Sequence, residues 1–390
     1  MARSIKNLHY LRSSNRISIL KRLATIGPTS RVEFSQELGL SKMTITNLVS
    51  ELILENLIEE TSINVTSSNA NGRKRTALKI PNYRINAIGL LIERYMIHCI
   101  AMDINGTEFY YDSTKIPQDA DSALFISLVL KLLHRLLDEL TGYSFAGIGI
   151  SSIGPLDLAT ATILHPTNFS SIENVPLGKI ITHEFQLPVF MVNCMSAGAL
   201  AEYLYGQARN IDTVIYLGIG TGVGTGIILN QHIFTGKAGF AGELGHMSID
   251  LNGPRCSCGQ NGCLETYISM FSILKKTGYS SIIALVTDLK NGVASKETYA
   301  EIAIYIRAVN TALITIANLF DPDMIILGDR CLPLMELYLD ECSESLNNAM
   351  IQRGTRKIPI KLSSFNIRAP LIGASALVFD KIFERSLPVR

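Results

Sequence analysis

The stretch from Glu243 to Glu265 decides how this chain is interpreted: it opens Glu243-Leu-Gly-His246 and, ten residues after the histidine, continues Cys256-Ser-Cys258-Gly-Gln-Asn-Gly-Cys263-Leu-Glu265. The glycines between the three cysteines let the backbone fold tightly around something small. Three thiolates and one imidazole make a closed tetrahedral zinc site that leaves no ligand position for water. The pattern therefore predicts one structural Zn ion, with the ligands His246, Cys256, Cys258 and Cys263.

The alternative is a glycine-rich loop with incidental cysteines. The tight spacing disfavours it, and so does the scatter of the remaining cysteines along the chain. Seven cysteines with three in a metal pattern fit a reducing compartment better than a disulfide framework. The N-terminus is polar and basic up to Arg16, and no apolar run reaches the length of a membrane span. We therefore expect a cytoplasmic protein with no membrane partner.

The charge of the chain is unevenly distributed. At 390 residues the chain is long enough for two or three domains of roughly 150 residues. Residues 1–80 hold 12 Lys and Arg against 6 Glu and no Asp, a balance of +6, whereas the remainder holds 23 basic and 28 acidic residues, a balance of −5. A basic N-terminal segment on a slightly acidic body indicates that this segment meets a polyanion.

Residues 1–80 have the pattern of a winged helix-turn-helix. Apolar residues recur at helical spacing over residues 17–24, a second short helix ends at Gly39, and Ser41 is a suitable N-cap for a third helix that runs to about Leu57. The third helix would lie in the major groove of DNA. Its candidate contacts are the N-terminal, outward-facing residues Ser41, Lys42, Met43, Thr44, Thr46 and Asn47.

A wing is expected to follow the third helix. Ile58 begins one short strand, residues 77–80 form another, and the basic triplet Arg73, Lys74 and Arg75 lies between them. A trihelical unit is common, and a basic triplet is often a solvated turn. Together and in this order they favour DNA binding, with the triplet contacting phosphates and the third helix reading base edges.

The rest of the chain alternates apolar strands and helices, which indicates an α/β architecture. The turn from Gly220 to Gly226 is rich in glycine, so its backbone amides could cradle a phosphate, or the turn could be a hinge between two lobes. It is not a P-loop, because no Gly-Lys-Ser/Thr follows it.

These residues resemble the ROK family (repressors, open reading frames and sugar kinases) over nearly the whole chain. The most specific piece is the segment from Gly239 to His246 followed by the cysteine loop, and Gly147-Ile-Gly149, Gly220-Thr-Gly222 and the segment from Pro322 to Gly328 support it. The N-terminal winged helix is similar to that of the NagC-, Mlc- and XylR-type transcriptional repressors, because the sugar kinases of the family lack it.

The resemblance implies a two-lobed, actin-like or ribonuclease-H-like α/β fold with the ligand in the cleft. The expected domains are the DNA-binding domain at 1–80, lobe 1 at 83–193 completed by 370–390, and lobe 2 with the zinc loop at 194–369. In the family, the acids and the histidine of the two motifs bind sugar hydroxyls. Carried over with the retained asparagine, the sugar ligands are Asn193, Glu243, His246 and Glu265. Without the resemblance, both glutamates would be interpreted as surface acids of loops.

Departures from the family pattern indicate whether this chain is a sugar kinase or a sugar sensor. ROK kinases carry Asn-Asp-x-Asn, whose Asp is the general base, whereas this chain reads Asn193-Cys194-Met195-Ser196. A thiol with an ordinary pKa of ~8.5 is a poor base at neutral pH. In the first phosphate loop, Leu91 replaces the metal-side Asp, and Glu93 and Arg94 replace two glycines. We therefore predict no catalytic residues and no ATP-dependent kinase activity.

The interpretation is a sugar-responsive transcriptional regulator, expected to act as a repressor of carbohydrate metabolism genes. It would bind operator DNA as a homodimer or dimer of dimers, and a carbohydrate inducer closing the cleft would displace the DNA-binding heads. Two alternatives remain open at this point. One is a sugar kinase with a DNA-binding head, and the other is a regulator controlled by a sugar-transport protein rather than by a small inducer.

Overall fold

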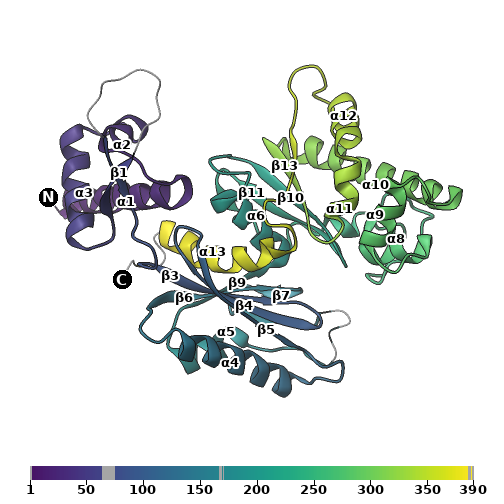
Figure 1. Cartoon of the computed structure of the whole chain (residues 1–390), viewed down its shortest axis with the longest axis horizontal. Coiled ribbons are helices and arrows are strands. Elements are labelled where there is room, and N and C mark those ends of the chain that lie inside the picture. Colours follow the sequence, from purple (N-terminus) through teal and green to yellow (C-terminus); the bar gives the residue numbers. More distant parts are fainter. Residues whose placement is uncertain (1, 64–74, 167–168, 170, 385–387, 389–390) are drawn as a thin grey trace.

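The computed structural model describes residues 2–63, 75–166, 169, 171–384 and 388. The order of its elements is three helices and a hairpin, then two α/β units that each contain a five-stranded sheet (Figure 1). The expected α/β architecture with an N-terminal winged helix is confirmed.

The N-terminal unit consists of α1 (Ala2–Ile26), α2 (Arg31–Glu37) and α3 (Lys42–Leu54), followed by the antiparallel pair β1 (Glu59–Ile63) and β2 (Arg75–Lys79). The expected N-cap is confirmed, because the Ser41 side chain accepts a hydrogen bond from the Thr44 backbone N–H. This N-cap satisfies one of the orphan donors at the start of the helix. The first helix begins much earlier than residue 17, and the third ends at Leu54 rather than Leu57.

The first five-stranded sheet has the order β5-β4-β3-β6-β9. Its strands are β3 (Asn86–Ile92), β4 (Met96–Asp103), β5 (Glu108–Lys115), β6 (Phe145–Ser152) and β9 (Val189–Asn193). The pairs β3–β6 and β6–β9 are parallel, whereas β3–β4 and β4–β5 are antiparallel. Helices α4 (Ser122–Glu139) and α5 (Leu177–Phe185) pack on one face, and the short pair β7 (Leu156–Asp157) and β8 (Thr162–Ile163) follows β6.

The second sheet has the order β12-β11-β10-β13-β14. Its strands are β10 (Val214–Ile219), β11 (Val223–Leu229), β12 (His232–Ile233), β13 (Met324–Gly328) and β14 (Ile360–Leu362). One face packs against a helical layer made of α7 (Glu265–Ile268), α8 (Met270–Thr277), α9 (Ile282–Lys290), α10 (Lys296–Phe320), α11 (Leu332–Leu337) and α12 (Leu339–Ala349). The 3-10 turns η1 (Leu244–His246) and η2 (Asn366–Arg368) lie in the connections.

Two helices lie between the sheets and pack against each other: α6 (Cys194–Tyr205) on β10 and β11, and α13 (Ala369–Phe383) on β3 and β6. Figure 1 shows α13 on the face of the first sheet opposite α4 and α5. Their contact is close because Gly373 has no side chain; a Cβ there would lie 1.8 Å from the Ala197 carbonyl oxygen.

The apolar core is continuous from the N-terminal unit into the body. A single cluster of buried side chains runs from α1 and α3 through α13 to α6. Helix α1 contacts α13 directly. The N-terminal unit is therefore packed onto the body rather than tethered by a linker alone.

Among the described residues, α10 is long and apolar enough to cross a membrane by length and composition, contrary to the expectation that no apolar run was long enough. Half of its most apolar window is buried inside the protein. Its buried side chains pack in the core of the second unit, and core helices pass the same composition test.

Candidate functional site

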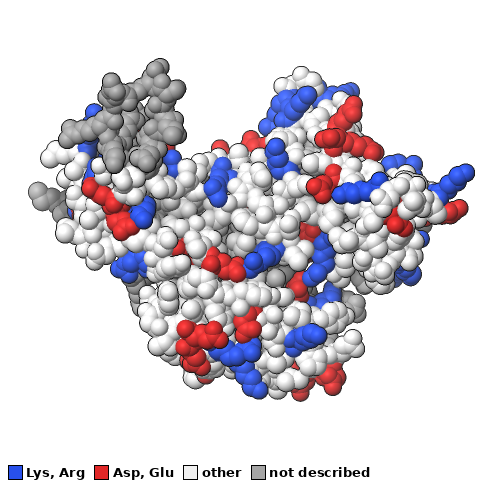
Figure 2. Space-filling model, in the orientation of Figure 1, with Lys and Arg blue, Asp and Glu red and all other residues white. Residues whose placement is uncertain are grey.

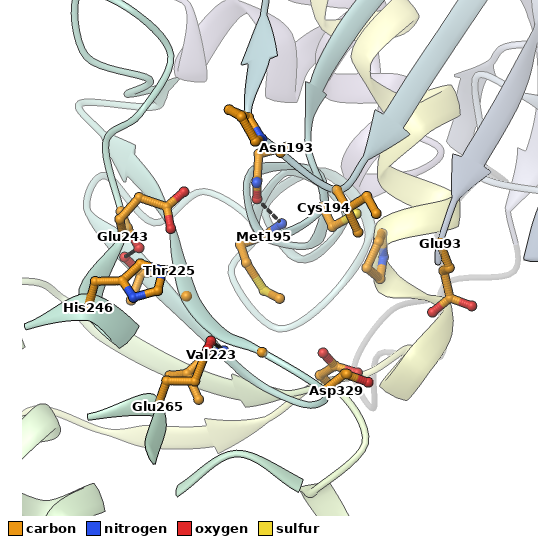
Figure 3. Close-up of a pocket in the computed structure, with 18 of the residues that line it drawn as sticks. Glu93, Asn193, Cys194, Met195, Val223, Thr225, Glu243, His246, Glu265 and Asp329 are labelled. Atoms are coloured by element: carbon orange, nitrogen blue, oxygen red, sulfur yellow. Dashed lines mark hydrogen bonds between the residues drawn. The ribbon is translucent and has the colours of Figure 1, made fainter. Parts of the chain in front are cut away.

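A cleft with a volume of about 430 Å³ lies between the two α/β units, lined by residues from both sheets. Figure 3 shows three groups of side chains around it. Glu243, His246 and Glu265 are on one side, Cys194 and Met195 begin α6 directly after Asn193, and Glu93 and Asp329 are on the far side. The structure therefore brings the four expected sugar ligands to one cleft.

The four expected metal ligands also come together. The side-chain donor atoms of His246, Cys256, Cys258 and Cys263 all lie within 4.8 Å of one another. The Cys256 Sγ is 3.7 Å from the His246 Nδ1, and the Cys258 Sγ is 3.5 Å from the Cys263 Sγ. A tetrahedron with Zn–S bonds of about 2.3 Å has edges of about 3.8 Å, so this donor set could hold a metal ion of zinc's size. The described cysteines are all free thiols.

The loop that carries Glu243 is held against β11. The Thr225 N–H donates to the Gly242 carbonyl at 2.8 Å, and a Cβ on Gly242 would lie 2.1 Å from the Thr225 carbonyl oxygen. Gly242 has φ +97°, a conformation that residues with side chains rarely adopt. This explains why glycine precedes the glutamate, and it fixes the Glu243 carboxylate at the cleft.

Burial raises the pKa of Glu243; nearby His246 counteracts part of this effect and Glu265 adds to it. The Glu265 Oε2 accepts a hydrogen bond of 2.9 Å from the Val223 N–H, which belongs to the strand following the glycine-rich turn. One backbone donor of this turn is thus already satisfied by a protein carboxylate. A phosphate seeking the same donor would have to displace that carboxylate.

Asn193 ends β9 and caps α6, because its Oδ1 accepts a hydrogen bond of 2.8 Å from the Met195 N–H. Cys194, which the family resemblance places where the kinases carry their base, is 9 % exposed. Burial raises the pKa of its thiol to about 12. At neutral pH the side chain is therefore a neutral thiol that cannot accept a proton from a sugar hydroxyl.

The far side of the cleft holds an ion pair that the sequence did not reveal. The Arg330 Nη2 donates to the Glu93 Oε1 at 2.7 Å, and the His98 Nε2 lies 3.3 Å from the Glu93 Oε2. Glu93 follows β3 of the first sheet and Arg330 follows β13 of the second, so the pair spans the cleft. Glu93, which replaces a glycine of the family pattern, is thus paired with Arg330 at this end of the cleft.

Most of the expected DNA-reading residues are exposed on α3. Ser41, Lys42, Met43, Thr46 and Asn47 are exposed, and Thr44 is half-buried. The Thr46 hydroxyl donates to the Lys42 carbonyl, so it is already engaged by the helix backbone. The remaining expected DNA contacts belong to the wing: Arg73 and Lys74 lie outside the described residues, and Arg75 begins β2 with its side chain outside them.

Several basic side chains of the N-terminal unit form ion pairs within it, which the charge count could not anticipate. Arg12 pairs with Glu51, and Arg16 pairs with Glu55, so α1 is fastened to α3. Figure 2 shows basic and acidic side chains interspersed over the visible face of the body. Part of the positive charge of the N-terminal segment is therefore paired with glutamates of the same unit.

Comparison with known proteins gives a consistent result. The ROK family profile matches residues 87–381. The xylose repressor of Bacillus subtilis is 28% identical over 385 residues, covering 96% of this chain and 97% of the repressor. A solved structure of a ROK family transcriptional regulator, a homologue of the E. coli Mlc protein, matches with a TM-score of 0.79 at 24% identity. The match covers 96% of this chain and 97% of the regulator.

A ROK family glucokinase from Streptomyces griseus, solved with glucose and AMPPNP, matches a smaller part. The match covers 75% of this chain and 98% of the kinase, with a TM-score of 0.64 at 23% identity. Both structural likenesses are below 25% identity and show the fold. The likeness to the repressor and the regulator extends over nearly the whole chain, whereas the likeness to the kinase covers three quarters of it.

Proposed function

This chain belongs to the ROK family, and from that premise we propose that it is a sugar-responsive transcriptional repressor rather than a kinase. The observation that carries the proposal is the combination of a full-length likeness to a xylose repressor with a cleft that keeps the sugar-binding acids and has a neutral thiol at the position of the base. We propose domains at 1–80, 83–193 with 370–390, and 194–369, supported by the two separate sheets.

The ligand in this proposal is a neutral sugar, with D-xylose as the first candidate because of the name of the relative. Asn193, Glu243, His246 and Glu265 would bind its hydroxyls. The lining of the cleft contains four carboxyl groups, Glu93, Glu243, Glu265 and Asp329, against the two guanidinium groups of Arg94 and Arg330. This balance disfavours a phosphorylated sugar, whose dianion would meet an excess of negative charge.

The metal in this proposal is one zinc ion with a structural role. Cys256, Cys258, Cys263 and the Nδ1 of His246 would hold it, which leaves the Nε2 of His246 to face the sugar. The bound ion would fix the loop between Glu243 and Glu265 and so hold both carboxylates at their spacing. Operator DNA would meet the exposed N-terminal residues of α3 and the wing, including Arg73, Lys74 and Arg75.

The oligomer in this proposal is a homodimer or a dimer of dimers, because repressors of this architecture read two half-sites. The place of action is the cytoplasm, in line with the free cysteines and the DNA ligand. The alternative is that a sugar-transport protein, rather than a small inducer, controls DNA binding. The test must distinguish these two forms of control.

The test uses the full-length protein. Genomic DNA fragments retained by the protein are sequenced to find the operator, and the operator affinity is then measured with and without D-xylose, D-glucose and N-acetylglucosamine. Titration calorimetry on the same sugars gives binding independently of DNA. We expect one sugar to bind and to lower operator affinity at least tenfold. Sugar-dependent consumption of ATP would refute the proposal, and operator binding without any sugar binding would favour control by a protein partner.

A further inference from the structure

The N-terminal unit is fastened to the body by a hydrogen bond from α1 to α6. The Lys21 Nζ donates to the Tyr203 hydroxyl at 3.0 Å, and the same ammonium lies 5.0 Å from the centroid of the Tyr203 ring. Tyr203 is only 3% exposed, and Lys21 is half-buried. A cation over an aromatic ring in a partly desolvated contact is worth more than the same pair in water.

The Tyr203 hydroxyl is also fixed from the side of the body. It donates to the Gln231 Oε1 at 3.3 Å, and the Gln231 Nε2 donates to the Asp212 Oδ1 at 2.7 Å. The hydroxyl thus accepts from Lys21 and donates to Gln231, so its orientation is determined at both ends. The contact therefore depends on where the second α/β unit holds Tyr203.

Lys21 lies beside α13 as well as α6. Its charge is one of those that act on the buried Asp380 carboxyl of α13, together with Glu384, Lys381 and His232. Helices α6 and α13 are the two helices between the sheets. Lys21 therefore reaches from the N-terminal unit to the place where both halves of the body meet.

The other end of α6 lies in the cleft. The helix begins at Cys194, directly after its cap Asn193, and Asn193, Cys194 and Met195 all line the cleft. All but one of its twelve residues are buried. A twelve-residue helix is about 18 Å long, so one stiff element connects the ligand cleft with the contact that holds the N-terminal unit.

We propose that α6 transmits ligand-induced movement of the two lobes to the DNA-binding unit, and that the Lys21–Tyr203 contact is where this movement is passed on. The inference rests on the proposed function, because it needs a ligand in the cleft and DNA on α3. Movement of Asn193 or Met195 on ligand binding shifts α6 along its whole length, since a helix packed on all sides moves as a unit. Lys21 then follows Tyr203, and α1 carries α3 with it through the ion pairs Arg12–Glu51 and Arg16–Glu55.

The experiment compares four full-length variants with the parent protein. Tyr203→Phe removes only the hydroxyl, Lys21→Met removes the ammonium while keeping the alkyl chain, and the double variant removes both. The matched control is Tyr205→Phe, since the Tyr205 hydroxyl lies on the same helix but donates to the Ile104 carbonyl of the first unit at 3.1 Å. For each protein we measure the operator Kd with and without saturating D-xylose, and the D-xylose Kd by calorimetry.

We expect the ratio of the two operator Kd values to fall at least fivefold in Tyr203→Phe and in Lys21→Met, while the D-xylose Kd stays within twofold. The double variant should show no additional loss, because both single changes remove one contact. Tyr205→Phe should keep the parent ratio. Parent-like ratios in Tyr203→Phe and Lys21→Met, or additive losses in the double variant, overturn the inference.

Failure of the proposed function is distinguishable from failure of the inference. If D-xylose does not bind the parent protein, the ligand assignment is wrong, and the operator measurements are repeated with whichever of the other tested sugars binds. Amide hydrogen exchange without sugar or DNA then tests separately whether the Lys21–Tyr203 contact holds α1 on the body. Exchange across residues 17–26 should then be faster in Tyr203→Phe and Lys21→Met, and unchanged in Tyr205→Phe. Equal exchange in the parent protein and these three single variants would show that the contact does not hold α1 and would overturn the inference.

Discussion

Replacing Asp380 by Asn should stabilise the folded chain at neutral pH. Asp380 lies in α13 and is 4% exposed. Burial raises the pKa of its carboxyl to about 6; nearby Glu384 adds to the rise, and Lys381, Lys21 and His232 oppose it. At pH 7.5 the folded protein must therefore hold a carboxylate that would ionise more readily in the unfolded chain. Asn keeps the shape of the side chain and removes this cost.

The size of the effect follows from the difference between a folded pKa of about 6 and the ordinary value of 3.8. That difference corresponds to about 3 kcal/mol. The folded-state pKa lies above the unfolded value, so this contribution of about 3 kcal/mol to the stability of the Asp380 protein is fully present below about pH 4 and is lost as the pH rises through about 6. For a chain of this length, about 3 kcal/mol shifts the melting temperature by about 4 °C.

The assay is thermal unfolding of the parent and Asp380→Asn between pH 5 and pH 8, with Asp119→Asn as a control because Asp119 is exposed. The gain from Asp380→Asn should be about 4 °C above pH 7 and about half of that at pH 5. Asp119→Asn should change little at any pH. A gain that does not depend on pH, or a loss of stability at pH 7.5, would refute the reasoning about a buried, destabilising charge.

The remaining predictions concern the metal, the ligand and the DNA. Cys263→Ser should lower bound zinc, measured by elemental analysis, from about one ion per chain to near none and should lower the melting temperature; full zinc content would argue against the ligand set. Glu243→Gln should weaken sugar binding at least tenfold by calorimetry, because hydrogen bonds to a charged group are worth about 1.5–3 kcal/mol, and should leave operator affinity intact. Asn47→Ala should lose about 1–3 kcal/mol of discrimination at one base pair of the operator, seen by competition with single-base variants. Lys74→Ala, in the basic triplet expected to contact phosphates, should weaken binding to all sequences alike and reduce the slope of log affinity against log salt by about one.

The sequence predicted the order of strands and helices well where the apolar pattern agreed with the residues that cap helices or form turns. Ser41 shows this, because a serine before an apolar periodic run also caps the helix in the structure. The start of α1 was missed, because most residues before Arg16 are polar and no acidic residue marks the first turn of the helix. The ends of helices depend on packing with distant segments, and the spacing of residues does not contain that information.

The cleft was predictable only in part. The three cysteines lie within eight residues, and His246 lies ten residues before the first of them. The four metal ligands could therefore be grouped from their spacing. The Glu93–Arg330 pair could not, because its partners are separated by 237 positions and meet only when the two sheets face each other. The same holds for Lys21 and Tyr203, which are 182 positions apart. Each residue taken alone looks like an ordinary surface cation, acid or tyrosine.

The core that continues from α1 through α13 to α6 has a practical consequence for anyone who trims the chain. A fragment starting after Pro81 would uncover the apolar surface of α13 that α1 contacts in the intact protein. Such a fragment would tend to self-associate through this newly exposed apolar surface. Its oligomeric state in solution would then reflect the truncation rather than the oligomer of the intact protein.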